Sequence, residues 1–518
     1  MEKTAAAPPA AAHPRPLDAA LGVLLLVASF FFWEWGILPT LGDGIATTLF
    51  FIALLLGCLF YLRLRKIRQN RQSLLWLLAA LAGSLPFALY GYRDINFCLI
   101  LFEACLCLVW LASSCHTVLS GQLDSLLAGD LLNQTVLVPL LNLGPLVTWL
   151  TGRARRSDVR QQSPTNVRRI AAALLGLLAS TPVLALVLVL LAGSDAGFSR
   201  LLSNWLRGID LSTALRWGFN LFLALPLAWY LFAAIFGNTF RFNTAQITGA
   251  GLRRGFARAH ALPPAALLAP LALLVAVYLL YFICMSGYLF AALGGELPQG
   301  YSFAQYARQG FFELCAVAVI NLVVVGLTWA FARRPAERHP LSLRLLAGAM
   351  SLLTCLLIVT AASKMLLYIG ALGLTPLRVE TLWLMALLLA IFLLLTLWHL
   401  HPGNAARPVV ICVVVFTLAL GLTNTSALIA SYNTERYLQN AVEEIDVALL
   451  ESLAEPALPA LRELREKADD PTVRAQATRA IGDIQAQWLK DEPRGSEAPW
   501  RDLRPWYRWN LQMAGNTT

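Results

Sequence analysis

Charged side chains inside apolar runs are the residues of this chain that could do chemistry. They are Glu34, Glu103, Arg216, Glu313, Lys364, Arg378 and Glu380. An ionised group costs about 3 kcal/mol at the centre of a membrane helix, so it normally faces a bundle interior, a water-filled cavity or a partner charge. Carboxylates there could bind a proton or a solute or act as bases, and Lys364 or Arg378 could pair with Glu103 or Glu313.

Three interpretations of these charges are compatible with the sequence. Ion pairs that lock helices together without touching a ligand are favoured, because both signs of charge are present. A site for a solute, a proton or a lipid headgroup is the second interpretation, and snorkelling of long side chains toward the interface is the third. None of the three identifies a catalytic residue.

Metal, nucleophile and nucleotide chemistry lack their minimum sequence features. The six histidines are scattered, and His399 and His401 are two positions apart at a helix end, where their side chains point apart. There is no HExxH, no GxSxG, no P-loop and no GxGxxG that opens a helix after a strand. All nine cysteines lie within or at the end of apolar runs, which is typical of small packing residues. The sequence therefore predicts no metal and no cofactor.

The elements that carry the charged residues must cross a membrane. Of the 518 residues, 58% are hydrophobic and only 14% are charged, whereas a soluble domain is about 45–50% apolar. The apolar residues recur in runs of about 20, the length at which a helix spans a hydrocarbon core of about 30 Å. The runs cover residues 21–41, 45–63, 73–91, 95–115, 170–193, 214–238, 264–292, 310–332, 343–368, 379–399 and 408–429. This pattern predicts an all-α, polytopic transmembrane helix bundle of about eleven spans.

The net charge of +10 comes from Lys and Arg in short alternate loops, such as LRLRKIRQNRQ and ARRPAERHPLSLR. That distribution marks cytoplasmic loops rather than a nucleic-acid surface, so the lipid bilayer is the predicted partner and nucleic acid is excluded. We expect a multi-pass protein of the bacterial inner membrane with a cytoplasmic N-terminus. An odd number of spans then places the C-terminus outside, and the candidate polar residues form one cluster that opens outward.

Composition divides the chain into three regions. Residues 1–20 are rich in proline and alanine and are predicted to be a disordered cytoplasmic tail. Residues 21–430 form the bundle, with an interrupted apolar segment near 121–150 that is predicted to be interfacial or re-entrant. Residues 431–518 are amphipathic and predict an extracytoplasmic helical domain, in which Asp470 and Pro471 should cap and open a helix.

Several strings in the second half resemble a bacterial membrane-protein family known as domain of unknown function 4153/4173. They are YSFAQYARQGFFEL (301–314), SKMLLYIGALGLTPLR (363–378), the stretch 431–461 and the closing WYRWNL. The first half is similar only in its hydropathy and its FFWEWG opening. The positions that fit the family pattern are Tyr306, Ala307, Arg308, Gly310, Phe311, Glu313, Tyr368, Gly373, Leu374, Thr375, Arg378, Asn424, Tyr432, Asn433, Glu435, Arg436, Tyr437 and Asp446. Lys364, Leu449 and Pro456 depart from it.

The resemblance implies a fold but no activity, substrate or catalytic residue. It adds Arg308 to the candidate polar cluster, and it selects Tyr432, Asn433, Glu435, Arg436 and Tyr437 as a candidate C-terminal motif. Of that motif, Glu435 and Arg436 are expected to cap and orient the start of a helix.

Three functions are compatible with these features. A non-enzymatic envelope sensor, regulator or docking protein is favoured, in which the C-terminal domain contacts another membrane or envelope protein. A transporter or lipid flippase would need a polar cavity that continues from the outer cluster to the cytoplasmic side. A membrane-embedded lipid or glycan transferase or hydrolase would need a carboxylate such as Glu103 or Glu313 as a base beside a lipid-accessible groove.

Overall fold

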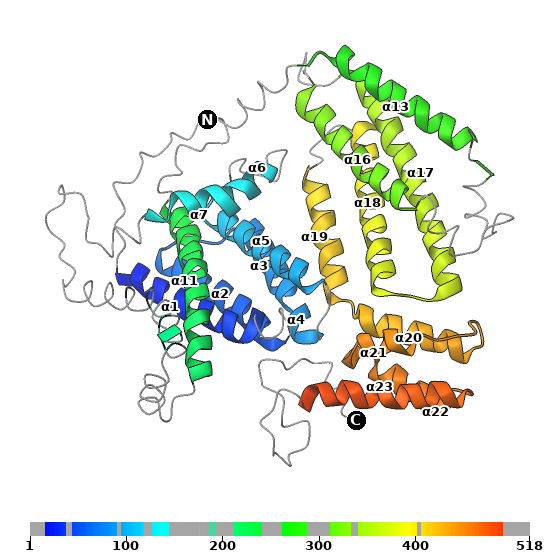
Figure 1. Cartoon of the computed structure of the whole chain (residues 1–518). Helices are drawn as coiled ribbons and strands as arrows, with labels where there is room; N and C mark the ends of the chain where they lie inside the picture. Colours follow the sequence, from blue (N-terminus) through cyan, green and yellow to red (C-terminus); the bar gives the residue numbers. More distant parts are fainter. Residues whose placement is uncertain are drawn as a thin grey trace. The chain divides into compact units, whose positions relative to one another are not determined.

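The computed structural model of the chain is built from helices (Figure 1). It describes residues 16–37, 44–90, 95–118, 127–144, 211–240, 262–284, 311–332, 340–400 and 406–489, with a few single positions between 176 and 194 and near 286. In these residues the only β-structure is an isolated bridge between Leu262 and Ala332. The helices divide into two compact units, which meet in sequence near residue 249.

The predicted all-α membrane bundle is confirmed. Nine of the described helices are long and apolar enough to cross a membrane, and a bent pair, Ala406–Leu422 with Thr425–Leu438, would make a tenth. These ten correspond to ten of the eleven predicted spans. The remaining one, 170–193, lies outside the described residues.

The first unit contains the helices up to residue 240. They are α1 (Pro16–Phe31), η1 (Phe32–Ile37), α2 (Ile45–Leu64), α3 (Arg71–Ser84), α4 (Pro86–Leu89), α5 (Asn96–Ser114), α6 (Leu127–Leu132), η2 (Asn133–Leu137), α7 (Val138–Leu141) and α11 (Leu211–Phe240). Helix α1 packs on α11, and α3 packs on α5. Between them lies an aromatic cluster that includes Phe32, Phe50, Phe51 and Phe87.

Residues 16–20, which were predicted to belong to the N-terminal tail, are helical. Helix α1 begins at Pro16, and Asp18 lies in its first turn. Proline is favoured at the first helical position because its missing N–H would have no intrahelical partner there. A carboxylate in the first turn is stabilised by the helix dipole. The remainder of the predicted tail is outside the described residues.

Residues 127–141 of the interrupted segment form one short helical stretch, α6–η2–α7. At 1.5 Å per residue such a stretch is about 22 Å long, shorter than a hydrocarbon core of about 30 Å. Its last part packs on α11, where Tyr230 donates a hydrogen bond to the Thr135 carbonyl at 2.8 Å. That this segment is interfacial or re-entrant stays a prediction.

The second unit contains the helices from residue 264 onward. They are α13 (Pro264–Cys284), α16 (Phe311–Phe331), α17 (Leu341–Leu372), α18 (Pro376–Leu400), α19 (Ala406–Leu422), α20 (Thr425–Leu438), α21 (Val447–Ser452), η3 (Glu455–Ala457), α22 (Leu458–Lys467) and α23 (Pro471–Leu489). Helices α17 and α18 form a hairpin with a short turn at Gly373–Thr375 (Figure 1). Helices α13 and α16 pack against α17.

A buried polar network joins α13, α16 and α17. Tyr278 donates to Asn321 Oδ1 at 2.6 Å, and Asn321 Nδ2 donates to Thr354 Oγ1 at 2.9 Å. Both Asn321 and Thr354 are fully buried. Hydrogen bonds of this kind hold helices together where apolar surface alone provides little driving force for association.

Replacing Asn321 by alanine should therefore loosen the packing of α16. We expect Asn321→Ala to lower the free energy of unfolding by about 1–2 kcal/mol, because the half-buried Tyr278 and the buried Thr354 lose their hydrogen bonds with Asn321. The matched control on the same helix is Val323→Ala, at a side chain that is 53% exposed. Thermal unfolding in detergent micelles measures both variants, and equal losses would contradict a role for the network.

Helices α20 to α23 form a C-terminal helical module around a common apolar core. The core residues run from Ile429 and Ala430 of α20 to Ile484 of α23. Asn424 caps α20, accepting from the Ala427 N–H at 3.1 Å, and the axis bends by 61° between α19 and α20. Asp470 Oδ1 accepts from the Thr472 N–H at 2.7 Å at the start of α23, as the sequence predicts for this cap.

Candidate functional site

The predicted polar residues are divided between the two units. Glu34 and Glu103 lie in the first unit, and the described residues of the second unit include Glu313, Lys364, Arg378 and Glu380. Glu313 is exposed in the first turn of α16, Lys364 is buried on α17, and Glu380 is half-buried on α18. Arg308 lies outside the described residues. The single outward-opening cluster stays a prediction.

Glu34 joins η1 to α11. Its Oε1 lies 3.0 Å from Arg216 Nη2, and its Oε2 accepts a hydrogen bond from Asn220 Nδ2. The π-helical turn at Phe32–Ile37 contains Glu34, and such turns reorient side chains relative to a regular α-helix. Glu34 is thus part of an ion pair between helices, which is the interpretation that the sequence favours for the charged set.

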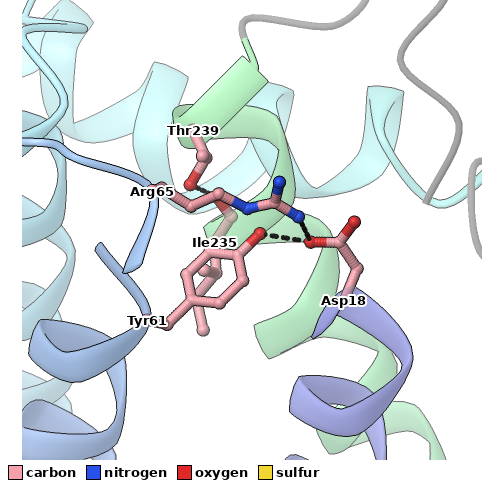
Figure 2. A network of polar contacts seen from close by, with 5 residues as sticks. All are labelled: Asp18, Tyr61, Arg65, Ile235 and Thr239. Carbon is pink, nitrogen blue, oxygen red and sulfur yellow. Dashed lines mark hydrogen bonds and ion pairs between the residues drawn. The ribbon is translucent and has the colours of Figure 1, made fainter. Parts of the chain in front are cut away.

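A second ion pair of the first unit lies where the start of α1 meets the ends of α2 and α11 (Figure 2). The Asp18 carboxylate at the start of α1 accepts a hydrogen bond from Tyr61 Oη at 2.6 Å and forms an ion pair with Arg65, the residue that ends α2. The Arg65 guanidinium also lies 5.0 Å from the ring centre of Phe240, at the end of α11. Asp18 is fully buried.

This network holds its charges in place. Burial by itself would lower the pKa of Arg65, but the hydrogen bonds and charge interactions with Asp18 and Tyr61 together outweigh it, and the net change is a raised pKa. The guanidinium therefore stays charged. Sequence reasoning missed this site because it assigned Asp18 to the tail and Arg65 to a basic loop. The proline and the acidic residue at 16 and 18 were the signal of a helix start that could have found it.

Glu103 has a different environment. It is fully buried on α5, and its Oε1 lies 3.5 Å from Cys107 Sγ, which donates to it. Its Oε2 has no hydrogen-bond partner in the described part of the chain. Gly83 of α3 lies directly against the carboxylate, since a Cβ at that position would be 2.2 Å from Oε2.

The largest gathering of the candidate residues lies between the α17–α18 turn and α20. The Asn433 amide pairs with both backbone groups of Leu374: its Oδ1 accepts from the N–H at 2.7 Å, and its Nδ2 donates to the carbonyl at 2.8 Å. Gly373 has a φ of +77° and a ψ of −178°, a conformation open almost only to glycine. A Cβ at this position would lie 2.5 Å from Asn433 Oδ1.

Two arginines bind the carbonyls at the C-terminal end of α17. Arg378 donates to the Leu372 carbonyl at 3.0 Å and the Gly373 carbonyl at 2.5 Å, and Arg436 of α20 donates to the Ile369 carbonyl at 3.2 Å. The last carbonyls of a helix lack intrahelical partners and carry partial negative charge, so cations there are stabilising. The Arg378 guanidinium also lies 4.1 Å from the ring centre of Tyr368.

Apolar side chains also pack across the contact between the α17–α18 hairpin and the C-terminal module, next to these hydrogen bonds. Leu374 packs against both the module core and the core of the hairpin, and Val379 of α18 packs against the module core. In the opposite direction, Tyr432 of α20 packs against the hairpin core. We call this set of contacts, made by residues 368–379 and by Tyr432, Asn433 and Arg436, the turn–α20 interface.

The residues of the candidate C-terminal motif therefore lie in three different environments. Tyr432, Asn433 and Arg436 face the turn, Tyr437 packs against the module core, and Glu435 is exposed and accepts from Gln439 at 2.9 Å. The expectation that Glu435 and Arg436 start a helix is wrong. They lie in the last turn of α20, because the helix already begins at Thr425 behind the Asn424 cap.

Comparison with known proteins adds a family. The family described as a domain of unknown function (DUF4153) matches residues 49–464, which include both sides of the turn–α20 interface. No curated protein and no solved structure matches the chain. Among the residues with described positions, no three His, Cys, Asp or Glu side chains are grouped so that they could hold a metal ion.

Proposed function

Because the chain belongs to the DUF4153 family, a domain of unknown function, we propose its function from its geometry: it is a non-enzymatic docking protein of the membrane. In this proposal the C-terminal module binds another membrane or envelope protein, and the turn–α20 interface couples that contact to the membrane helices. The observation that carries the proposal is the double hydrogen bond of Asn433 to Leu374 within interlocking apolar cores.

The contacts support a coupled module rather than a tethered one. A module on a flexible linker would need no pairing with the hairpin, yet one amide and two arginines form hydrogen bonds with backbone groups at the C-terminal end of α17 and in its turn. Five hydrogen bonds of this kind join the turn, Arg378 and α20, and each contributes about 1 kcal/mol to holding them together. A force or binding event at α23 would thus reach α17 and α18 through α20.

The proposal includes an orientation. Five basic residues between α2 and the start of α3, Arg63, Arg65, Lys66, Arg68 and Arg71, support a cytoplasmic location for that loop in a bacterial inner membrane. The C-terminal module then lies outside. A membrane-impermeant maleimide added to intact cells should label Thr478→Cys on the exposed side of α23, as read by peptide mapping because the chain has nine native cysteines. Labelling only after lysis would reverse the orientation.

The coupling is tested by measuring distances within the second unit. Spin labels are introduced as unnatural amino acids at Leu366, which is exposed on α17, and at Thr478, which is exposed on α23. Double electron–electron resonance should give a narrow distance distribution in the otherwise wild-type chain and a broad one in Asn433→Ala. The control is Gln439→Ala, which removes an amide that directly follows α20 and donates a hydrogen bond to Glu435, and its distance distribution should stay narrow.

Docking itself is tested with a photo-crosslinking residue at Arg479 of α23, in native membranes. We expect a defined protein adduct, identified by mass spectrometry, that decreases severalfold in Asn433→Ala at equal expression. A crosslinker at Leu366 is the control and should capture lipid. A distance distribution that stays narrow in Asn433→Ala would refute the coupling, and the absence of a protein adduct at Arg479 would refute docking.

A further inference from the structure

The first unit contains a buried carboxyl that the docking proposal does not use. Glu103 lies within the apolar span Asn96–Ser114 and is fully buried. Glu34 and Asp18, the other buried carboxylates described above, each contact an arginine. In the described ranges, the one polar partner of Glu103 is the Cys107 thiol, a weak donor that reaches one of the two carboxyl oxygens.

Among the residues that the structure describes, no cation lies within reach of the Glu103 carboxyl. Helix α5 itself carries Cys105 and Cys107, and Cys58 of α2 is close enough to Cys107 to interact with it electrostatically. On α11 the nearest titratable group is Tyr230, which interacts with Cys105. The single charged residue of α3 is Arg71, which is about 18 Å along the helix from Gly83. The packed segment η2 contains no titratable residue.

The packing around the carboxyl is specific. Gly83 provides the space for Oε2, and a side chain there would occupy the position of that oxygen. The contact with Gly83 brings Glu103 against the backbone of α3, the helix on which α5 packs. An ionised carboxylate in such a site would cost several kcal/mol without a compensating charge, whereas the neutral acid can remain.

We infer that Glu103 is a proton-binding site inside the membrane, built by α3 and α5. The ligand is a proton, held on the carboxyl while Gly83 packs against it. The inference is independent of the docking proposal, because it concerns the first unit and would hold whether or not the C-terminal module binds a partner.

A hydrophobic carbodiimide tests this site, since it reacts in apolar surroundings with protonated carboxyls. The acid proton moves to a nitrogen of the reagent, the carboxylate oxygen bonds to the central carbon, and acyl migration to nitrogen leaves a stable N-acylurea with no leaving group.

Dicyclohexylcarbodiimide is applied to the full-length protein in liposomes over a range of pH, and adducts are mapped by mass spectrometry. The expected result is an adduct on Glu103 and none on Glu34, whose partner is Arg216. Labelling of Glu103 should fall by about tenfold per pH unit above its midpoint.

Infrared difference spectroscopy provides the second measurement. A C=O stretching band of a protonated carboxyl should be present, should decrease as the pH rises, and should be absent in Glu103→Gln. The carbodiimide map uses the wild-type protein, so it holds even if Glu103→Gln does not fold. A band that is absent, or that stays constant over the pH range in which the protein remains folded, would overturn the inference, and the band decides where the two measurements disagree.

Discussion

Replacing Asp18 by alanine is expected to lower the free energy of unfolding by about 3–5 kcal/mol. The loss is large because Arg65 remains buried, with a side chain only 11% exposed, after its carboxylate is removed. Tyr61 also loses the acceptor of its 2.6 Å hydrogen bond. Thermal unfolding in detergent micelles, followed by fluorescence-detected size-exclusion chromatography, measures the change.

Two controls separate the buried charge from a general effect of mutation. Lys467→Ala removes an ion pair with Glu463 in which both side chains are exposed, and it should leave the free energy of unfolding almost unchanged. The double variant Asp18→Leu with Arg65→Met removes both charges and should recover most of the loss, because a buried ion pair can be replaced by apolar side chains at little cost. A double variant as unstable as Asp18→Ala would contradict this account.

An alanine at position 373 is the second change with a large expected effect. We expect Gly373→Ala to destabilise the turn–α20 interface by about 2–4 kcal/mol, because a φ of +77° with a ψ of −178° is strained for any L-residue and the new Cβ would meet Asn433 Oδ1. The spin-label distances between Leu366 and Thr478 should broaden as they do in Asn433→Ala.

A neighbouring glycine offers the matched control. Gly370 lies in α17, and a Cβ there would meet nothing within 4 Å, so Gly370→Ala should be neutral or stabilising by up to about 1 kcal/mol. The double variant Gly373→Ala with Asn433→Ala separates the two causes. If the clash dominates, it should be no less stable than Gly373→Ala. Equal stability of Gly370→Ala and Gly373→Ala would show that the turn does not need glycine.

The two largest effects fall at sites with different sequence signals. Gly373 and Asn433 of the turn–α20 interface belong to strings that resemble the DUF4153 family. The sequence therefore identified Asn433 as a candidate residue without any information on its contacts. The sequence could not predict that Leu374 is the hydrogen-bond partner of Asn433, because Leu374 contributes its backbone groups and not its side chain to these hydrogen bonds. Asp18 had no comparable signal beyond the proline at a helix start.

The charged candidate residues also show that the sequence does not predict which side chains come into contact. Glu34 and Glu103 have the same residue type in equally apolar runs, yet one lies beside Arg216 and the other beside a thiol and Gly83. The difference depends on the direction in which each side chain points around its helix axis and on which helix packs there. One sequence pattern therefore predicted pairing for both, and within the described residues Glu34 has an ion-pair partner and Glu103 does not.

The sequence by itself determined that this chain is a bundle of membrane helices, where most of those helices lie, and that Asp470 and Pro471 begin a further helix. These features follow from local quantities, namely the length of apolar runs, helix caps and amphipathic spacing, because a helix in lipid satisfies its own backbone. Only the tertiary structure decided that Asp18 meets Arg65, that Asn433 binds the α17–α18 turn, and that no described cation lies beside Glu103. Those outcomes depend on contacts between segments far apart in the chain, whose rotation and depth are set by packing and not by the composition of either helix.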